Sequence, residues 1–218
     1  EPYDPEEVTS FELGFKGSLG ENTSLNASLF RYDYTDFQVL QVVGIQTVTR
    51  NAGDATVNGL ELEALSNIND SLSINYGLTL LDATYGEFLN TNGIQPQLGE
   101  QQLEGNYLTN APKVSINLGL NYTSLMSSGS SLTYRANAAY KSRIYFSEFN
   151  EYSQDAYTIV DLNLIWESSD ETLRSRFFIK NATDEEYISG YLSSATGGGR
   201  FGQWGYPRTA GIEIQRNF

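Results

Sequence analysis

The sequence predicts an all-β fold in which about nine strands form an up-and-down antiparallel sheet. Apolar and polar residues alternate with a period of two in nearly every segment, as they do in strands with one apolar face. Aromatic residues make up 13% of the chain and glycine is plentiful, whereas proline is scarce, which is typical of strands joined by turns. Short and long connections alternate, so one end of the predicted sheet is plain and the other is elaborate.

The alternation defines each predicted strand in turn. In VSINLGLNY (114–122), apolar residues occupy every second position, and serine, asparagine and glycine lie between them. The predicted strands cover residues 9–19, 23–40, 53–67, 71–86, 111–124, 131–146, 156–167, 172–189 and 203–218. Short turns are predicted at 20–22, 67–70, 125–130 and 168–171, and long loops at 41–52, 87–110, 147–155 and 190–202.

One predicted strand loses its alternation part-way along. In SLNASLFRYDY (24–34), the apolar positions shift from Leu25 and Leu29 to Phe30 and Tyr32. Either a bulge near Leu29 or departure of the strand from the apolar zone explains this shift.

The alternation leaves open whether the apolar face contacts a protein core or lipid. Three features favour lipid. The polar faces are rich in Ser, Asn, Thr and Gly, as expected of a water-filled interior. About 10 residues at roughly 3.3 Å each, tilted near 45°, span roughly 24 Å, the height of the apolar band of an outer-membrane barrel. Aromatic residues gather near strand ends, as in interfacial girdles. The prediction is therefore a transmembrane barrel wall.

Composition excludes several function classes. The chain has no Cys and no His, which removes disulfides, thiol chemistry, His-based catalysis and most zinc sites. The net charge of -14 argues against nucleic-acid binding. No apolar run is long enough for a transmembrane helix. The clustered carboxylates, such as Glu61 and Glu63, are assigned to a polar lumen, and Asp33, Asp36 and Asp54 lack the spacing of a calcium loop. We therefore predict no catalytic residue, cofactor or metal.

Five motifs, in order along the chain, carry a family resemblance. The ending GYPRTAGIEIQRNF (205–218) resembles the last strand of TonB-dependent outer-membrane receptors. FFIKNATDEEY (177–187) is similar to their penultimate strand, with Ala182 in place of the usual Leu. PEEVTSFELGFKG (5–17), NAGDATVNGLELE (51–63) and TNAPKVSINLGLNY (109–122) resemble three further strands of the family. Arg216 departs from the pattern, because an aromatic residue is common there.

The resemblance implies that residues 1–218 are the C-terminal part of an antiparallel barrel of about 22 strands. The plug domain and the TonB box are then expected outside this chain, and the absence of an initiator Met or signal peptide at Glu1 agrees with a piece of a longer protein. The resemblance further implies that Phe218 belongs to the C-terminal signal read by the barrel assembly machinery. The short turns become periplasmic and the long loops extracellular.

The resemblance implies a non-enzymatic receptor in the outer membrane of a Gram-negative bacterium. Such a receptor binds a scarce nutrient, for example a ferric siderophore, cobalamin or an oligosaccharide, and imports it with energy delivered through TonB. The implied partners are outer-membrane lipid and lipopolysaccharide, the TonB complex, the assembly machinery and a small-molecule nutrient. Two alternatives stay open: a passive porin-like barrel, and a soluble β-rich carbohydrate-binding module with Leu72, Ile74 and Leu78 in a core.

Candidate cargo contacts lie on the loops and in the upper lumen. Aromatic rings there stack on a sugar or a siderophore ring, although an interfacial girdle is the rival interpretation. Lys141 and Arg143 suit an anionic cargo, and ordinary salt bridges in the lumen are the rival interpretation. The predicted contacts are Phe88, Tyr107, Lys141, Arg143, Tyr145, Phe149, Tyr152 and Trp204.

Overall fold

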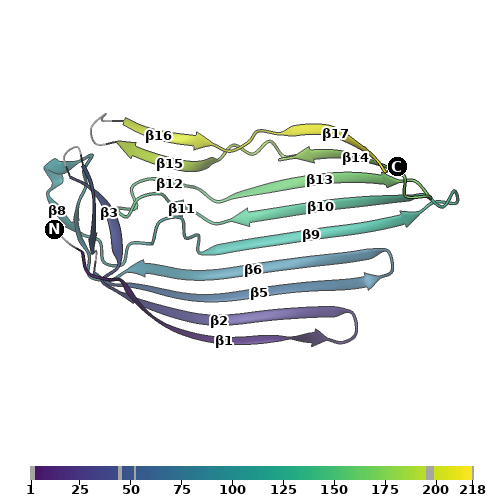
Figure 1. Ribbon diagram of the computed structural model, residues 1–218. Coiled ribbons are helices and arrows are strands. Elements are labelled where there is room, and N and C mark those ends of the chain that lie inside the picture. The colour runs from purple at the N-terminus through teal and green to yellow at the C-terminus, as the bar shows by residue number, and fades with distance from the viewer. Residues whose placement is uncertain (1–2, 44–45, 52, 195–198, 218) are drawn as a thin grey trace.

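A single antiparallel sheet organises the computed structural model, which describes residues 3–43, 46–51, 53–194 and 199–217. The sheet has nine strands, and their spatial order is their order along the chain (Figure 1). They are β1 (Glu7–Leu19), β2 (Thr23–Thr35), β5 (Ala55–Asn69), β6 (Leu72–Tyr85), β9 (Val114–Leu125), β10 (Ser131–Lys141), β13 (Tyr157–Glu167), β14 (Leu173–Lys180) and β17 (Thr209–Arg216). The predicted nine-strand meander is confirmed.

The two ends of the sheet differ as the connection lengths predict. Tight turns close one end, and Gly20 and Gly129 adopt positive φ there (67° and 82°), which glycine does without strain. At the other end, each long connection carries its own hairpin (Figure 1). These are β3 (Gln38–Val43) with β4 (Gln46–Asn51), β7 (Leu89–Thr91) with β8 (Glu100–Gln102), β11 (Ile144–Tyr145) with β12 (Ser153–Gln154), and β15 (Ile188–Ser194) with β16 (Gly199–Trp204). A short 3₁₀ turn, η1 (Pro96–Leu98), separates β7 from β8.

Several predicted boundaries are wrong at this elaborate end. The strand predicted at 23–40 ends at Thr35, because Asp36 turns the chain with a φ of 54°. The strands predicted at 131–146, 172–189 and 203–218 become β10, β14 and β17, and the leftover residues enter loop hairpins. No bulge occurs near Leu29, since β1 and β2 pair without a register shift. Instead, β2 leaves the apolar zone there.

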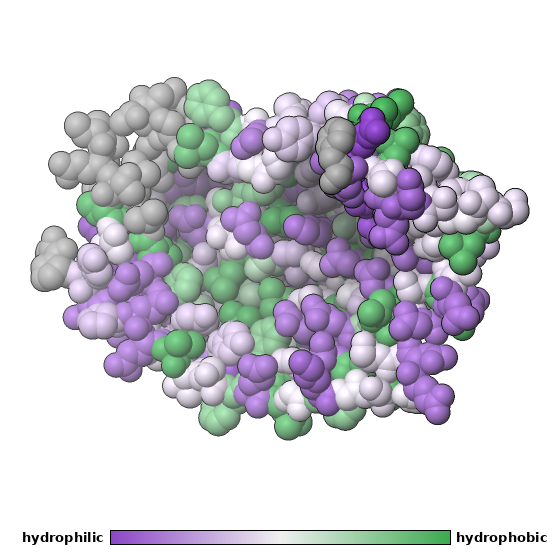
Figure 2. All heavy atoms as spheres, turned by 45° about the vertical axis from the view of Figure 1, so that its right-hand side comes forward, coloured by the Kyte–Doolittle hydropathy of each residue, from purple (hydrophilic) through white to green (hydrophobic). Residues whose placement is uncertain are grey.

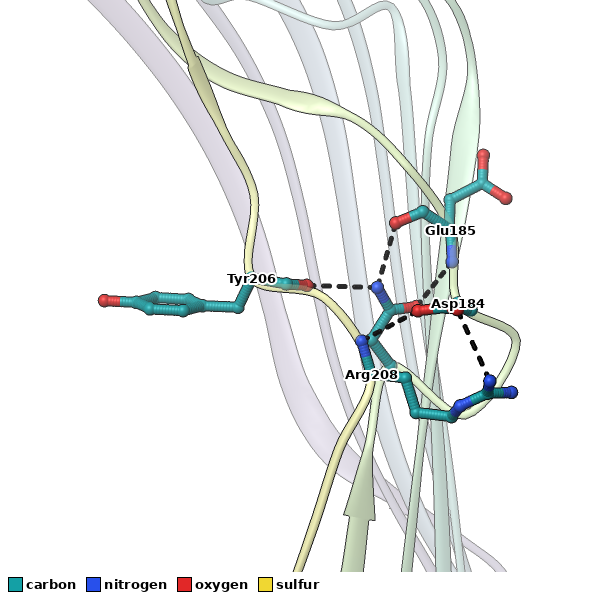
Figure 3. Close-up of polar contacts among 5 residues, drawn as sticks. Asp184, Glu185, Tyr206 and Arg208 are labelled. Atoms are coloured by element: carbon teal, nitrogen blue, oxygen red, sulfur yellow. Dashed lines mark hydrogen bonds and ion pairs between the residues drawn. The ribbon is translucent and has the colours of Figure 1, made fainter.

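A buried asparagine ends β14. Asn181 is 3% exposed and has a φ of 48°, which strand geometry does not allow. Its backbone N–H donates to Asp161 Oδ1 at 2.8 Å, and its Nδ2 donates to the carbonyl oxygens of Glu185 (2.9 Å) and Tyr206 (3.1 Å). The backbone N–H of Glu185 donates to Asn181 Oδ1 at 2.9 Å. The backbone N–H of Asn181 thus ties the end of β14 to β13. The Asn181 side chain joins the turn at Glu185 to the segment before β17 (Figure 3).

Asp184 completes this tie. Its φ of 57° turns the chain, and its Oδ1 accepts the backbone N–H of Arg208 at 2.9 Å. The Arg208 guanidinium lies 3.4 Å from Asp184 Oδ2, and the tyrosine side chain of residue 206 points away from the cluster (Figure 3). The motifs around residues 181–184 and 205–209, which carry the family resemblance, therefore meet in space and fix the base of the last loop.

The apolar side of the sheet, the outer face, is exposed rather than covered by a second layer. Strand register places apolar residues opposite one another, for example Tyr76 with Leu118 and Leu118 with Ala138. Leu118 is 46% exposed and Ile212 is 72% exposed. Tyr122 and Tyr134 lie near the plain end with ring centroids 6.1 Å apart, where an interfacial girdle is expected. This pattern fits the predicted lipid-facing wall.

The same burial pattern does not fit a soluble module. Leu72, Ile74 and Leu78, the core that such a module requires, are only partly buried. The buried hydrophobic cluster lies instead among the long connections. Among the described residues, no helix has the length and apolar character needed to cross a membrane.

The opposite side, the inner face, is polar and hollowed. Asn75 lies directly over Gly119, where a Cβ would come within 2.1 Å of Asn75 Oδ1. Asn117 lies beside Gly77 on the paired strand. An open hollow of about 340 Å³ lies on this face, and Gly77, asparagine side chains and Glu63 border it. Figure 2 shows the hollowed wall and the hydrophilic residues gathered around it.

Lipid contact predicts opposite outcomes at adjacent positions of β9. In the membrane protein that carries this chain, we expect Leu118→Arg to lower the free energy of unfolding in bilayers by about 2–4 kcal/mol, because a guanidinium would face hydrocarbon. The matched variant Asn117→Arg points inward and should cost less than about 1 kcal/mol. Urea titration in phospholipid vesicles measures both values, and equal losses would rule out lipid on the outer face.

Candidate functional site

The long connections at one end of the sheet share a buried aromatic cluster. Tyr85 at the end of β6, Phe88 and Leu103 are 5%, 4% and 2% exposed. Residues from three neighbouring connections pack against them, including Phe37 and Phe149. The connections 36–54, 86–113 and 142–156 therefore form one packed unit above the wall.

Residues 142–156, here called the central hairpin, stand between two neighbouring loops. Ile144 pairs with Gln154 and Tyr145 with Ser153, and the Phe146 N–H donates to the Tyr152 carbonyl at 2.9 Å. Adjacent residues of a strand point to opposite sides, so Tyr145 faces one neighbouring loop and Phe146 the other.

An ion pair closes the base of the central hairpin. Arg143 Nη2 lies 2.7 Å from Asp155 Oδ1, and Nε donates to the same oxygen at 3.0 Å. Both side chains are exposed, so solvent screens the pair and it adds little stability. The Asp155 carboxylate nevertheless offsets the positive charge of Arg143, which was predicted to contact an anionic cargo.

On its first side, the central hairpin stacks against loop 86–113. The rings of Tyr107 and Tyr145 are nearly parallel, 10° apart, with centroids separated by 5.7 Å. Lys113 Nζ lies 4.1 Å from the centroid of the Tyr107 ring, which is cation–π geometry. Two tyrosines and one ammonium group thus form a half-exposed polar and aromatic surface.

Asparagine side chains join the same two segments. Asn90 Nδ2 donates to Glu148 Oε1 at 3.1 Å, and Asn92 Nδ2 donates to Glu151 Oε2 at 3.0 Å. Asn106 Nδ2 donates to the Glu148 carbonyl oxygen at 2.9 Å. Burial raises the pKa of the Glu148 carboxyl above its usual value of 4.5, and the nearby charge of Glu151 adds to the shift.

Asn150 makes the most complete connection between the two segments. Its Oδ1 accepts the Tyr107 N–H at 2.8 Å, and its Nδ2 donates to the Tyr107 carbonyl at 2.9 Å and to the Ser147 carbonyl at 3.1 Å. The side-chain amide therefore pairs with Tyr107 as a neighbouring strand would. This arrangement fixes the backbone that carries the Tyr107 ring.

On its second side, the central hairpin stacks against β15–β16. Tyr191 lies 5.1 Å from Tyr152 and 5.9 Å from Phe146 between ring centroids, with interplanar angles of 17° and 13°. Arg200 Cζ lies 4.4 Å from the Tyr152 ring centroid. Gln154 Oε1 accepts the backbone N–H of Ile188 at 2.7 Å. Aromatic contacts thus connect three successive loops.

The structure brings together only part of the predicted contact set. Tyr107, Tyr145, Phe149 and Tyr152 all lie on or against the central hairpin. Phe88 is buried in the loop cluster, so a ligand does not reach its ring in this conformation.

The remaining predicted contacts lie elsewhere. Lys141 is exposed at the end of β10, in register with Ser115 and Tyr157. Trp204 ends β16 and is 67% exposed. Phe218, predicted to carry the assembly signal, lies outside the described residues.

Sequence reasoning missed Lys113, Asn150, Tyr191 and Arg200. Lys113 lies within the motif TNAPKVSINLGLNY, which predicts only a strand. Nothing in the sequence around Asn150 indicates its hydrogen bonds to the distant Tyr107. For Tyr191 and Arg200 a signal existed: GYLSS and GGGRFGQW (190–194 and 197–204) flank a glycine run, which favours a hairpin that places its two arms side by side.

Comparison with known proteins gives consistent matches. The family "TonB dependent receptor-like, beta-barrel" matches residues 1–182. A probable TonB-dependent siderophore receptor, PiuA, of Acinetobacter baumannii is 29% identical over 85% of this chain and 24% of its own length. The ferrioxamine B receptor of Salmonella typhimurium is 22% identical over 85% of this chain and 25% of its own length.

Solved structures share the fold. The ferric yersiniabactin uptake receptor FyuA from Yersinia pestis superposes with a TM-score of 0.80 and 21% identity, over 98% of this chain and 30% of that chain. The siderophore receptor PiuA from Acinetobacter baumannii superposes with a TM-score of 0.75 and 24% identity, over 97% of this chain and 28% of that chain. The chain thus spans about a quarter of the length of the curated relatives it matches.

Removing the Asn150 amide should loosen loop 86–113. We expect Asn150→Ala to destabilise the closed loops by roughly 1–3 kcal/mol, because the N–H and C=O of Tyr107 lose their partner. Hydrogen exchange of the Tyr107 region, measured by mass spectrometry, should then be at least about fivefold faster. Asn121→Ala on the inner face is the matched control and should leave this exchange unchanged, and equal effects of the two variants would contradict the assignment.

The raised pKa of Glu148 predicts pH-dependent loop contacts. A carboxyl whose folded pKa exceeds its unfolded value contributes stability that is full below about pH 4.5 and is lost as the pH rises through the raised pKa. Protection factors in residues 86–113 should therefore fall as the pH rises above about 4.5. Glu148→Gln should make them independent of pH, and an unchanged pH dependence in that variant would refute the role of Glu148.

Proposed function

The chain belongs to the TonB-dependent receptor β-barrel family, and we propose that it forms the C-terminal barrel wall and four extracellular loops of a ferric siderophore importer. Members of this family are transport receptors of the outer membrane of Gram-negative bacteria. The names of the relatives, a probable siderophore receptor and a ferrioxamine B receptor, support a siderophore as the cargo.

The exposed apolar outer face carries this proposal. Its rows stay in register from strand to strand, and the side chains along them are exposed. Such a wall has no partner in water and matches hydrocarbon. The outer face then contacts lipid and lipopolysaccharide, and the barrel assembly machinery recognises the segment that carries Phe218.

In this proposal the barrel wall encloses the path of the siderophore, and the extracellular loops bind it. We propose that Tyr107, Tyr145 and Tyr152 contact the cargo from the central hairpin, with Phe149, Lys141 and Trp204 nearby on the same elaborate end. The hollowed inner face supplies polar groups against which a plug domain, encoded outside these residues, packs. TonB, coupled to the proton gradient across the inner membrane, then moves that plug, and no bond in the cargo changes.

Energy-dependent uptake tests the proposal. Deleting the gene should abolish uptake of ⁵⁵Fe supplied as a ferric siderophore to iron-starved cells, and complementation should restore it. A protonophore or loss of TonB should stop accumulation while leaving surface binding intact, because energy enters only through the plug.

Two outcomes would contradict the proposal. Uptake that continues without TonB would indicate a passive pore. Wild-type growth of the deletion strain on every ferric siderophore tested, with a defect on an oligosaccharide, would instead assign a carbohydrate cargo.

A further inference from the structure

A stripe of positive charge runs along the inner face of the wall on β10 and β14. The chain has a net charge of -14, yet these two strands carry five of its 13 lysine and arginine residues, two on β10 and three on β14, and no Asp or Glu. Arg135 pairs in register with Asn121 of the inner face. On β14, Phe177 pairs with Ile212 of the outer face, so the residues on either side of Phe177 point inward. The five residues, here called the basic stripe, are Arg135, Lys141, Arg174, Arg176 and Lys180.

The basic stripe extends from one end of the wall to the other. Lys141 is the last residue of β10, at the elaborate end, and Arg174 is the second residue of β14, at the plain end. The strand between them, β13, gives the order of the cations. Along it, successive positions are roughly 7–20 Å apart. Lys141 lies opposite Tyr157, Arg135 opposite Asn163, Arg176 opposite Ile165 and Arg174 opposite Glu167.

Asparagine side chains orient two of the guanidinium groups. Arg135 Nε donates to Asn121 Oδ1 at 2.9 Å. Arg176 Nε donates to Asn163 Oδ1 at 3.1 Å, and Asn163 lies on the strand between the two arginines. A neutral amide fixes the guanidinium without cancelling its charge. The terminal N–H groups of Arg135 therefore keep their capacity to bind an anionic oxygen.

Little negative charge offsets the basic stripe. Among the described residues, its one ion pair joins Arg176 Nη1 to Glu213 Oε2 at 3.3 Å. Asp161 and Glu167 lie on the intervening β13, but neither forms an ion pair with the stripe in the described structure. Ordinary salt bridges within the lumen therefore account for Arg176 alone. The other four cations are available to a partner that is not among these residues.

A series of separated cations suits an anion that moves. A single tight site would retain an anion, whereas several weaker sites in sequence let it enter and leave. Walls of low dielectric also strengthen the field of charges inside a narrow passage. Because the basic stripe lies on the wall strands rather than on the loops, it acts after the cargo has been captured.

We infer that the basic stripe guides an anionic ferric chelate along the inner face once the plug has moved, with Arg135 and Arg176 as its central contacts. This inference rests on the proposed function and narrows its substrate class to chelates with a net negative charge. Catecholate and carboxylate ligands leave such a charge on the iron(III) complex. Ferrioxamine B, by contrast, carries a free ammonium group and is cationic.

Removing two charges tests the basic stripe without altering the loops. Uptake of a ⁵⁵Fe-labelled ferric tris-catecholate is measured on energised cells that carry the full receptor, and its Kd is measured on de-energised cells. In the double variant Arg135→Gln, Arg176→Gln, the maximal uptake rate should fall about tenfold, because the passing anion loses two charged partners. The Kd should equal that of the wild type, because the capturing loops are unchanged.

Two further variants separate the effect of charge from an effect on structure. The double variant Arg135→Lys, Arg176→Lys keeps both charges and should recover most of the rate, because a moving anion needs charge rather than a planar fork. Lys16→Gln removes a cation from the inner face of β1, where Lys16 pairs with Asn26, and should leave the rate unchanged. Normal amounts of heat-modifiable receptor in the outer membrane establish that each variant folds.

Several results would overturn the inference and leave the importer assignment standing. These are a wild-type rate in the double glutamine variant, a double lysine variant that is equally slow, and wild-type import of ferrioxamine B but not of the catecholate. Entry of vancomycin into de-energised cells of the glutamine variant would show that the two arginines hold the plug instead, and would also overturn it. Import of no ferric chelate by the wild type, at normal receptor levels, would overturn the proposed function and the inference with it.

Discussion

Backbone hydrogen bonding is the constraint on which this structure depends. A wall in hydrocarbon finds no water for its N–H and C=O groups, so the sheet itself must pair them. The nine strands do so by joining each to the next in antiparallel register, from β1 to β17. Because side chains alternate along every strand, this continuous ladder also places apolar residues in rows on one face and polar residues on the other. The outer face and the hollow inner face are thus two consequences of one pairing scheme.

Alternation along the strands was enough to predict the nine-strand sheet. A period of two indicates a strand and also assigns each residue to one of the two faces of the sheet. It was not enough for the elaborate end. β14 stops at Asn181 because a buried amide and a positive φ end the ladder, and neither leaves a trace in hydropathy. β11 and β12 have two residues each, too few for any periodicity. Of the predicted contacts, Tyr107, Tyr145 and Tyr152 do lie together at the central hairpin, where their rings take part in aromatic stacks. Lys113, Asn150 and Tyr191 depend on contacts between loops that only the folded chain creates.

The loops are held together by amides and rings more than by ion pairs. Asn90, Asn92 and Asn150 fix one side of the central hairpin, whereas stacked rings hold the other. Amide hydrogen bonds are directional, so they fix the position of loop 86–113 against the central hairpin. Stacked rings bury apolar area between the central hairpin and β15–β16.

Solvent accessibility along β9 and β10 tests the central claim most directly. The chain has no native cysteine, so single cysteines carrying nitroxide labels report each position without interference. In bilayers, labels at Leu118, Leu120 and Ala136 should collide readily with oxygen, and labels at Asn117, Asn121 and Arg135 with a water-soluble nickel complex. This alternation of period two is what a wall between lipid and an aqueous lumen predicts. If the labels on the outer face were shielded from both reagents, those residues would lie in a protein core, and the account of a membrane-spanning wall would be wrong.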